Sequence, residues 1–148
     1  MPPAPEQTNQ APIQVLLVED HDLLRRGLRI LIETNARYKV CGEADSASAA
    51  VALAVKLKPD LALVDLTLRD STGFELLHEL KRLLPGLPSL VLSLHSEDMY
   101  AASALRAGAR GYLKKEDAKK HLDEAMECIL SGKVWLSDLM RRSMPEFL

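Results

Sequence analysis

Five polar side chains directly follow short apolar runs, which places them where they could act together: Glu19, Asp20, Asp65, Ser93 and Lys115. Carboxylates that are brought together repel one another unless a cation or a proton lies between them. A hard dication with oxygen ligands fits such a set, and Mg²⁺ is the expected one. A carboxylate can also attack a phosphoryl group, while a lysine and a hydroxyl neutralise the transferring charge. The set therefore predicts phosphoryl transfer onto an aspartate, and it lacks a general base for hydrolysing a foreign substrate.

The apolar runs before these residues predict the strands of a buried parallel sheet. Five such runs alternate with five stretches of helical periodicity, and this alternation implies βαβ units with helices on both faces. The predicted strands span residues 13–18, 38–44, 61–64, 90–92 and 111–113, and the predicted helices begin near residues 23, 46, 74, 96 and 117. Asp22 and Ser46 are the expected caps of the first two helices. Because the carboxyl ends of parallel strands share one edge of the sheet, the polar residues are expected to converge there.

The composition is that of one globular domain, and its net charge does not favour binding to nucleic acid or to an anionic membrane. The chain has 148 residues, 47% of them hydrophobic, and a formal net charge of -2. Its apolar runs are too short to span a bilayer, and its basic residues lack interleaved aromatics, so we expect no direct binding of nucleic acid. Four prolines within residues 1–12 predict a disordered leader rather than a secretory signal. Two separated cysteines form neither a disulfide framework nor a zinc motif, which favours the cytoplasm.

Several segments together resemble the receiver domain of two-component response regulators. They are Val15–Asp22, Pro59–Leu66, Gly73, Val91–His95 and Ala107–Lys115. The resemblance covers about residues 13–131 and is closest to the branch whose members carry a C-terminal helix-turn-helix output domain of the LuxR type. It implies a flavodoxin-like, doubly wound α/β fold: a five-stranded parallel sheet in the order 2-1-3-4-5 with five flanking helices. Residues 132–148 are then expected to form a linker or a short C-terminal helix.

The resemblance also assigns expected roles to the acidic residues. Asp65 resembles the phospho-acceptor. Asp20 resembles the main metal-binding acid, with Glu19 beside it as direct or water-mediated support, and Thr67 would offer its backbone carbonyl to the Mg²⁺ ion. One departure lies in the following loop, where Arg69 replaces a proline found in many relatives; this predicts a more polar and more mobile loop.

Three further residues match the family's transfer and switch positions. Ser93 matches the hydroxyl that contacts the phosphoryl group, and Lys115 matches the family lysine. Tyr112 matches the aromatic switch residue that changes rotamer with the loop after Ser93. Each residue also has a purely structural interpretation: Ser93 as a turn hydroxyl, Tyr112 as a core aromatic and Asp65 as a turn or cap residue.

The expected function is a signalling switch in a phosphorelay, which catalyses only its own phosphorylation and dephosphorylation and is otherwise no enzyme. A sensor histidine kinase would be the donor, a homodimer is one arrangement that the resemblance allows, and transcription would be regulated through an output domain absent from these residues. The alternatives are a receiver-only signalling protein and a degenerate receiver that serves as a binding scaffold. An aspartate-nucleophile phosphatase fits poorly, since Thr67 stands where that class needs a second aspartate as general acid.

Overall fold

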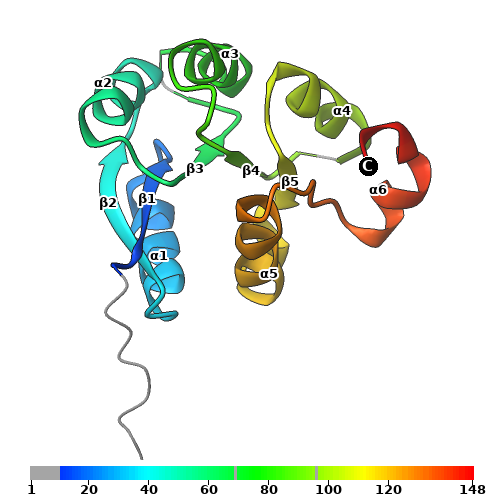
Figure 1. Ribbon diagram of the computed structural model, residues 1–148, viewed down its shortest axis with the longest axis horizontal. Helices are drawn as coiled ribbons and strands as arrows, with labels where there is room; N and C mark the ends of the chain where they lie inside the picture. The colour runs from blue at the N-terminus through cyan, green and yellow to red at the C-terminus, as the bar shows by residue number, and fades with distance from the viewer. Residues whose placement is uncertain (1–10, 69, 96) are drawn as a thin grey trace, which may run out of the picture.

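The fold is a five-stranded parallel sheet with helices on both faces (Figure 1). The computed structural model describes residues 11–68, 70–95 and 97–148, with the backbone alone for 97–99. The strand order is β2-β1-β3-β4-β5, which confirms the predicted flavodoxin-like topology. The strands are β1 (Ile13–Val18), β2 (Tyr38–Ala44), β3 (Leu61–Asp65), β4 (Ser89–Ser93) and β5 (Gly111–Lys114).

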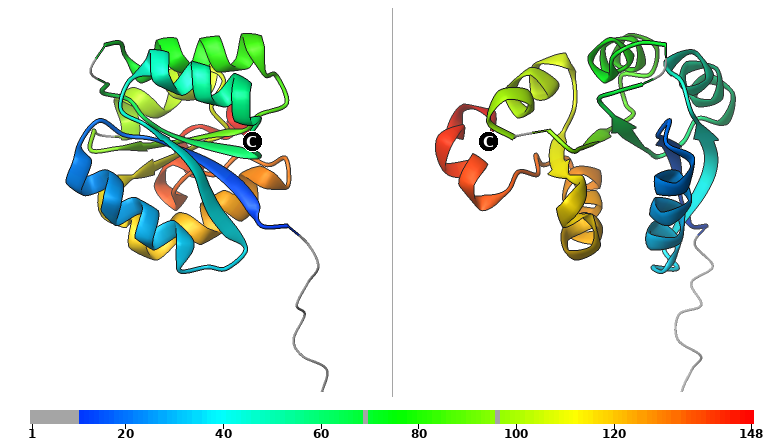
Figure 2. Two further views of the ribbon diagram at one scale, coloured as in Figure 1. Left: turned by 90° about the vertical axis from the view of Figure 1, so that its left-hand side faces the viewer. Right: turned by 180° about the vertical axis from the view of Figure 1, so that it is seen from behind.

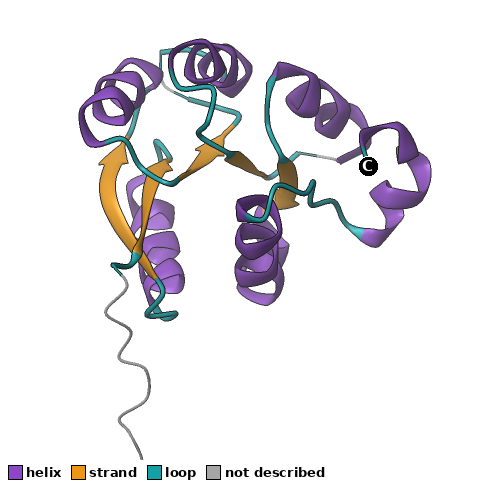
Figure 3. Cartoon of the chain, in the orientation of Figure 1, coloured by secondary structure: helices purple, strands orange, loops and turns teal. Residues whose placement is uncertain are grey.

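The helices form one layer on each side of the sheet, as Figures 2 and 3 show. One face carries α1 (Asp22–Glu33) and α5 (Ala118–Leu130), and the opposite face carries α2 (Ala47–Leu57), α3 (Gly73–Leu83) and α4 (Glu97–Ala107). Short 3₁₀ turns at Lys115–Asp117 and Pro145–Phe147 flank α5 and the C-terminal helix α6 (Asp138–Ser143). Among the described residues, no helix combines the length and the apolar character that a membrane crossing requires.

Some predictions fall on residues that lie outside the described ones. These are most of the proposed leader (residues 1–10), the loop position Arg69, and Ser96 as the first residue of the fourth helix.

Local capping explains where the helices begin. The Ser46 side chain accepts a hydrogen bond from the Ala49 amide and caps α2, as predicted. The cap predicted for α1 was wrong: the His21 ring nitrogen Nδ1 accepts from the Leu24 amide at 3.2 Å, while Asp22 is the first helical residue and pairs with Arg25. An acid within the first turn still interacts favourably with the helix dipole, which is why the sequence alone did not separate the two positions.

Two apolar clusters lie on the two faces of the sheet, and the strands contribute alternate residues to each. In β1, Leu16 and Val18 belong to the cluster under α2, α3 and α4, while Val15 and Leu17 belong to the cluster under α1 and α5. All five residues of both β3 and β4 are buried. This explains the continuous apolar runs in the sequence, because a strand covered on both faces has no solvent side.

The residues after α5 return to the free edge of β5. We call residues 133–148 the C-terminal segment. Its Trp135 pairs in parallel with Gly111: the Trp135 amide donates to the Arg110 carbonyl at 3.0 Å, and the Tyr112 amide donates to the Trp135 carbonyl at 3.2 Å. A Cβ atom on Gly111 would lie 3.1 Å from the Trp135 carbonyl oxygen, so glycine permits this close approach. The segment contains the short helix α6.

Candidate phosphoryl-transfer site

Three carboxylates meet where β1 and β3 end. Glu19 and Asp20 follow β1, and Asp65 is the last residue of β3. One oxygen atom from each lies within 4.8 Å of the others. β1 and β3 are neighbours in the sheet, so their carboxyl ends emerge side by side, and residues 46 positions apart in the sequence become neighbours in space.

Lys115 brings a cation from the far edge of the sheet into the same site. Its Nζ atom lies 2.7 Å from Glu19 Oε1 and 3.3 Å from Asp65 Oδ2. The side chains of all three residues are nearly removed from water, with exposed fractions of 7% for Lys115, 2% for Glu19 and 7% for Asp65. Lys115 therefore links the end of β5 to the ends of β1 and β3, across the whole width of the site.

Burial disfavours the charged form of Glu19. The pKa of Glu19 is raised above its ordinary value, chiefly because burial disfavours the charged form; the Asp65 charge adds to this, and the hydrogen bond from Lys115 opposes it. The sequence predicted Glu19 as a neighbour that supports Asp20. In the folded chain Glu19 is the more deeply buried of the two, and it contacts Lys115 directly.

The loop between β3 and α3 folds back tightly on the end of β3. The Thr67 amide donates to Asp65 Oδ1 at 3.3 Å, and the Gly73 amide donates to the Leu66 carbonyl at 2.7 Å. A Cβ atom on Gly73 would lie only 2.5 Å from the Asp65 carbonyl oxygen, so this position accommodates only glycine without a backbone shift. The loop thus holds Thr67 beside the Asp65 carboxylate.

Hydrogen bonds to Asp70 also fix this loop to the start of α2, and they were not predicted from the sequence. Asp70 Oδ1 accepts from the Ala47 amide at 2.7 Å, and Asp70 Oδ2 accepts from the Ser48 amide at 3.2 Å and from the Ser48 hydroxyl at 3.0 Å. These backbone donors lower the pKa of Asp70. The first backbone amides of a helix have no partner within the helix, so an acceptor for the start of α2 could be expected. The sequence does not say which distant acid accepts from these amides.

Ser93, His95 and Tyr112 form a second group at the same edge. Ser93 is fully buried, and its hydroxyl accepts from the His95 amide at 3.0 Å. The Tyr112 hydroxyl donates to the His95 carbonyl at 3.2 Å, and the Tyr112 ring is also fully buried. The His95 ring lies 3.3 Å from the Thr67 hydroxyl, so it spans the two loops. His95 is exposed, and its contacts with Ser93, Tyr112 and Thr67 were not predicted from the sequence.

The donor set suits a hard cation. The three clustered residues offer only carboxylate oxygens, and carboxylate oxygen is the ligand that Mg²⁺ prefers in proteins. A transition metal would favour nitrogen or sulfur ligands, and the cluster among the described residues contains neither. Clustered carboxylates with one adjacent ammonium group also leave a net negative charge, which a divalent cation would offset.

Comparison with known proteins gives the family. The family model described as "Response regulator receiver domain" matches residues 15–127. The transcriptional regulatory protein YdfI of Bacillus subtilis is 36% identical over 130 residues, which make up 87% of this chain and 61% of YdfI. The DNA-binding transcriptional activator DevR/DosR of Mycobacterium tuberculosis is 34% identical over 85% of this chain and 58% of that protein. The chain thus spans about three-fifths of the length of these curated relatives.

Solved structures agree with this assignment. A LuxR-family two-component response regulator from Aurantimonas sp. SI85-9A1 superposes with a TM-score of 0.85 at 32% identity, covering 92% of this chain and 97% of that one. The signal receiver domain of the putative response regulator NarL from Mycobacterium tuberculosis gives a TM-score of 0.79 at 27% identity, covering 84% of this chain and all of that one. The family model, the fold and these relatives agree that this chain belongs to the response regulator receiver domains of two-component systems.

Proposed function

We propose that this receiver domain accepts a phosphoryl group on Asp65 with the help of Mg²⁺ and uses it as a switch. The observation that carries the proposal is the position of Lys115 Nζ, within 3.3 Å of Asp65 and 2.7 Å of Glu19 in a nearly dry site. A buried carboxylate beside a fixed ammonium group is arranged to attack a phosphoryl group whose charge must be neutralised.

The metal would be held by the carboxylates of Glu19, Asp20 and Asp65, together with the backbone carbonyl of Thr67. When bound, Mg²⁺ supplies positive charge to the phosphoryl oxygens. Glu19 and Asp20 would serve as ligands, directly or through water in the case of Glu19, and the loop contacts of Thr67 and Gly73 keep Thr67 near the acceptor.

In the transfer step, one carboxylate oxygen of Asp65 forms a bond to phosphorus while the bond from phosphorus to the donor breaks. With a phosphohistidine donor, the leaving imidazole keeps the electron pair of the P–N bond and takes up a proton from solvent. The Lys115 ammonium and the Ser93 hydroxyl stabilise the oxygens of the transferring group. Attack of water on the aspartyl phosphate later releases inorganic phosphate and restores Asp65.

Ser93 and Tyr112 would carry the signal away from the site. A change at Ser93 reaches Tyr112 through His95, whose amide contacts the serine and whose carbonyl contacts the tyrosine. Phosphorylation then acts as a local electrostatic event on a two-state element.

The wider role is part of the same proposal. YdfI and DevR/DosR are named as transcriptional regulators, and this chain matches only part of each of them. We propose that residues 13–131 form the receiver and that 132–148 lead toward an output domain through which transcription is regulated. The sensor histidine kinase as donor, the homodimer and the cytoplasmic location stay predictions from the sequence.

The rival functions make different predictions. A phosphatase would turn over phosphoesters steadily, and Thr67 occupies the place of its general acid. A degenerate scaffold would bind no Mg²⁺ and would not respond to phosphorylation, and the complete set of acids and Lys115 argues against it.

The test is labelling by a small phosphodonor in the presence of Mg²⁺. The wild-type chain is expected to gain one phosphoryl group by intact mass spectrometry, and Asp65→Asn none. Asp123→Asn is the matched control, because Asp123 is an exposed acid on α5, and it should label as the wild type does. Undiminished labelling of Asp65→Asn at an aspartate would overturn the assignment.

A further inference from the structure

The C-terminal segment shares its apolar core with the predicted switch residue. Leu136, Met140 and Met144 are 2%, 1% and 7% exposed, and they belong to the same cluster as Tyr112 and the inner residues of α4. In Figure 1 the segment folds back beside α4 and β5. The side of the sheet that ends in β5 is therefore covered by the chain's own C-terminal residues.

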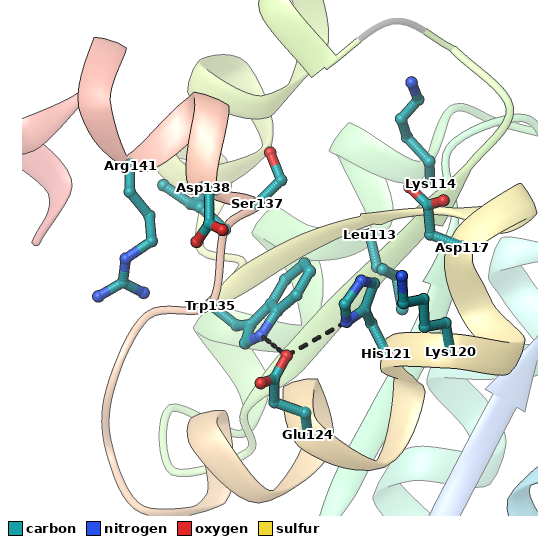
Figure 4. Close-up of a pocket in the computed structure, with 11 residues that line it drawn as sticks. Leu113, Lys114, Asp117, Lys120, His121, Glu124, Trp135, Ser137, Asp138 and Arg141 are labelled. Atoms are coloured by element: carbon teal, nitrogen blue, oxygen red, sulfur yellow. Dashed lines mark hydrogen bonds and ion pairs between the residues drawn. The ribbon is translucent and has the colours of Figure 1, made fainter.

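Trp135 anchors the segment to α5 as well as to β5. Its indole nitrogen donates to Glu124 Oε2 at 3.2 Å, and His121 Nδ1 lies 3.4 Å from the same oxygen. Figure 4 shows both rings directed toward the Glu124 carboxylate, beside a pocket of about 310 Å³ that lies between α5 and the segment. Together with the backbone hydrogen bonds to Arg110 and Tyr112, this makes a specific docking site and not a loose apolar contact.

Helix α6 and the residues after it complete the docking. Met140 faces the core, whereas its neighbour Leu139 is 66% exposed. Beyond α6, the Phe147 ring lies 5.7 Å from the guanidinium of Arg106, which belongs to α4. The segment thus contacts β5, α5 and α4 at once.

A continuous line of contacts runs from this segment to the predicted phosphorylation site. The Trp135 carbonyl accepts from the Tyr112 amide, and the Tyr112 hydroxyl donates to the His95 carbonyl. The His95 amide donates to the Ser93 hydroxyl, which lies at the predicted site. Leu136 and Met140 also belong to the same buried cluster as Tyr112, so an outward rotation of the ring would disturb the packing of this cluster.

We propose that the docked C-terminal segment and the phosphorylated site stabilise each other. Docking holds Tyr112 inward, the inward Tyr112 holds His95, and His95 holds the loop that places Ser93 at the phosphoryl group. Coupling between two sites is reciprocal, so phosphorylation must favour docking by the same factor by which docking favours phosphorylation. This inference rests on the proposed function of Asp65 and adds the partner that reads it: the chain's own residues 133–148.

The first test compares two substitutions on adjacent residues of α6 in the full chain. Met140→Ala weakens docking, and Leu139→Ala is the matched control. The measurement is the affinity for beryllofluoride with Mg²⁺, a mimic of the phosphoryl group, by isothermal titration calorimetry, with circular dichroism to verify folding. We expect Met140→Ala to bind about fivefold more weakly or worse and Leu139→Ala to bind as the wild type does. An affinity of Met140→Ala equal to or above that of the wild type would refute the coupling.

The reciprocal test uses the unmodified chain. Trp135 is the only tryptophan in the sequence, so its fluorescence reports on the segment alone. Beryllofluoride with Mg²⁺ should change this fluorescence and slow hydrogen exchange at the amides of Tyr112 and Trp135, and neither should change in Asp65→Asn. Uptake of beryllofluoride with unchanged or faster exchange contradicts the coupling but leaves the proposed function standing. A wild-type chain that takes up no beryllofluoride contradicts the proposed function, and the coupling falls with it.

Discussion

Two regions, the carboxyl edge of the sheet and the free edge of β5, are buried by opposite kinds of interaction. At the carboxyl edge, Lys115 lies between Glu19 and Asp65, and charged groups are removed from water. Along β5, the C-terminal segment buries the apolar side chains of Leu136 and Met140 in the cluster that includes Tyr112. The first region contains the proposed reactive groups and lowers the stability of the fold, because removing charges from water is unfavourable. The second contributes stability through apolar burial.

The contrast explains why the two regions respond differently to change. In the site, each charge depends on a partner, so removal of one group leaves another buried and unpaired. In the segment, truncation of a side chain loses contacts and leaves a cavity, and the remaining groups need no new partner. The contrast therefore predicts effects of different sizes for changes in the two regions.

The largest effect is expected for Lys115→Met. Loss of the ammonium group leaves Glu19 and Asp65 facing each other without a cation, and we expect a loss of about 3 kcal/mol in the free energy of unfolding. Urea unfolding at neutral pH without Mg²⁺ measures it. Lys114→Met is the matched control, because the Lys114 side chain is 35% exposed and pairs with the exposed Glu116; a change below about 0.5 kcal/mol is expected there. Equal losses for both variants would remove the distinction between the two lysines.

Addition of Mg²⁺ should relieve the same charge repulsion. A ligand that binds only the folded chain stabilises it by about 2.7 kcal/mol at one hundred times its dissociation constant. The wild type should therefore melt at a higher temperature with Mg²⁺ than with the same ionic strength of NaCl. Asp20→Asn removes one predicted ligand and should lose most of the increase. A full increase in Asp20→Asn would place the ion elsewhere.

Leu136→Ala tests the apolar region. Leu136 is 2% exposed, so its truncation should cost about 2 kcal/mol, the lower end of the usual range because the segment can partly collapse onto the gap. Leu139→Ala, on the exposed side of α6, should change the free energy of unfolding by less than about 0.5 kcal/mol. The difference in the free energy of unfolding between Leu136→Ala and the wild type should be the same with and without Mg²⁺. For Lys115→Met this difference should change when Mg²⁺ is added. Equal stabilities of the two leucine variants would show that the segment is not docked.

The smallest effect concerns the exposed tether at Asp70. Its pKa is lowered by hydrogen bonds from the Ala47 and Ser48 amides. Because the folded carboxyl has a lower pKa than the unfolded one, its contribution is present above the unfolded pKa and is lost as the pH falls through the folded pKa. The wild type should therefore lose slightly more stability than Asp70→Asn as the pH falls from about 5 to about 2, measured as urea midpoints. Parallel curves for the two proteins would show that the tether contributes nothing.

The sequence predicted the convergence of the strand-end residues better than the loop contacts around them, for a physical reason. Strand-end acids and Lys115 follow buried apolar runs, and a parallel sheet brings such ends together whatever the details of the loops. Contacts between loops have no such rule. The pairing of Asp70 with Ala47, and of Trp135 with Gly111, depends on where distant segments come to lie.

The docked segment had a partial signal in the sequence. Met140 and Met144 are spaced by one helical turn, which is typical of a helix with one buried side. That spacing could predict a packed helix, but it could not name Tyr112 and α4 as the surfaces beneath it. The burial of Glu19 could not be predicted either. Two adjacent acids in a sequence suggest an exposed position, and only the folded chain places Lys115 next to Glu19.

The most direct measurement of the central claim is a crystal structure of the chain with Mg²⁺ and beryllofluoride. The account predicts beryllium bonded to an Asp65 carboxylate oxygen, with Mg²⁺ between Asp20 and Asp65, and with Lys115 Nζ and the Ser93 hydroxyl on the fluorine atoms. Beryllofluoride bound at any other carboxylate, or Lys115 turned away from it, would contradict the account.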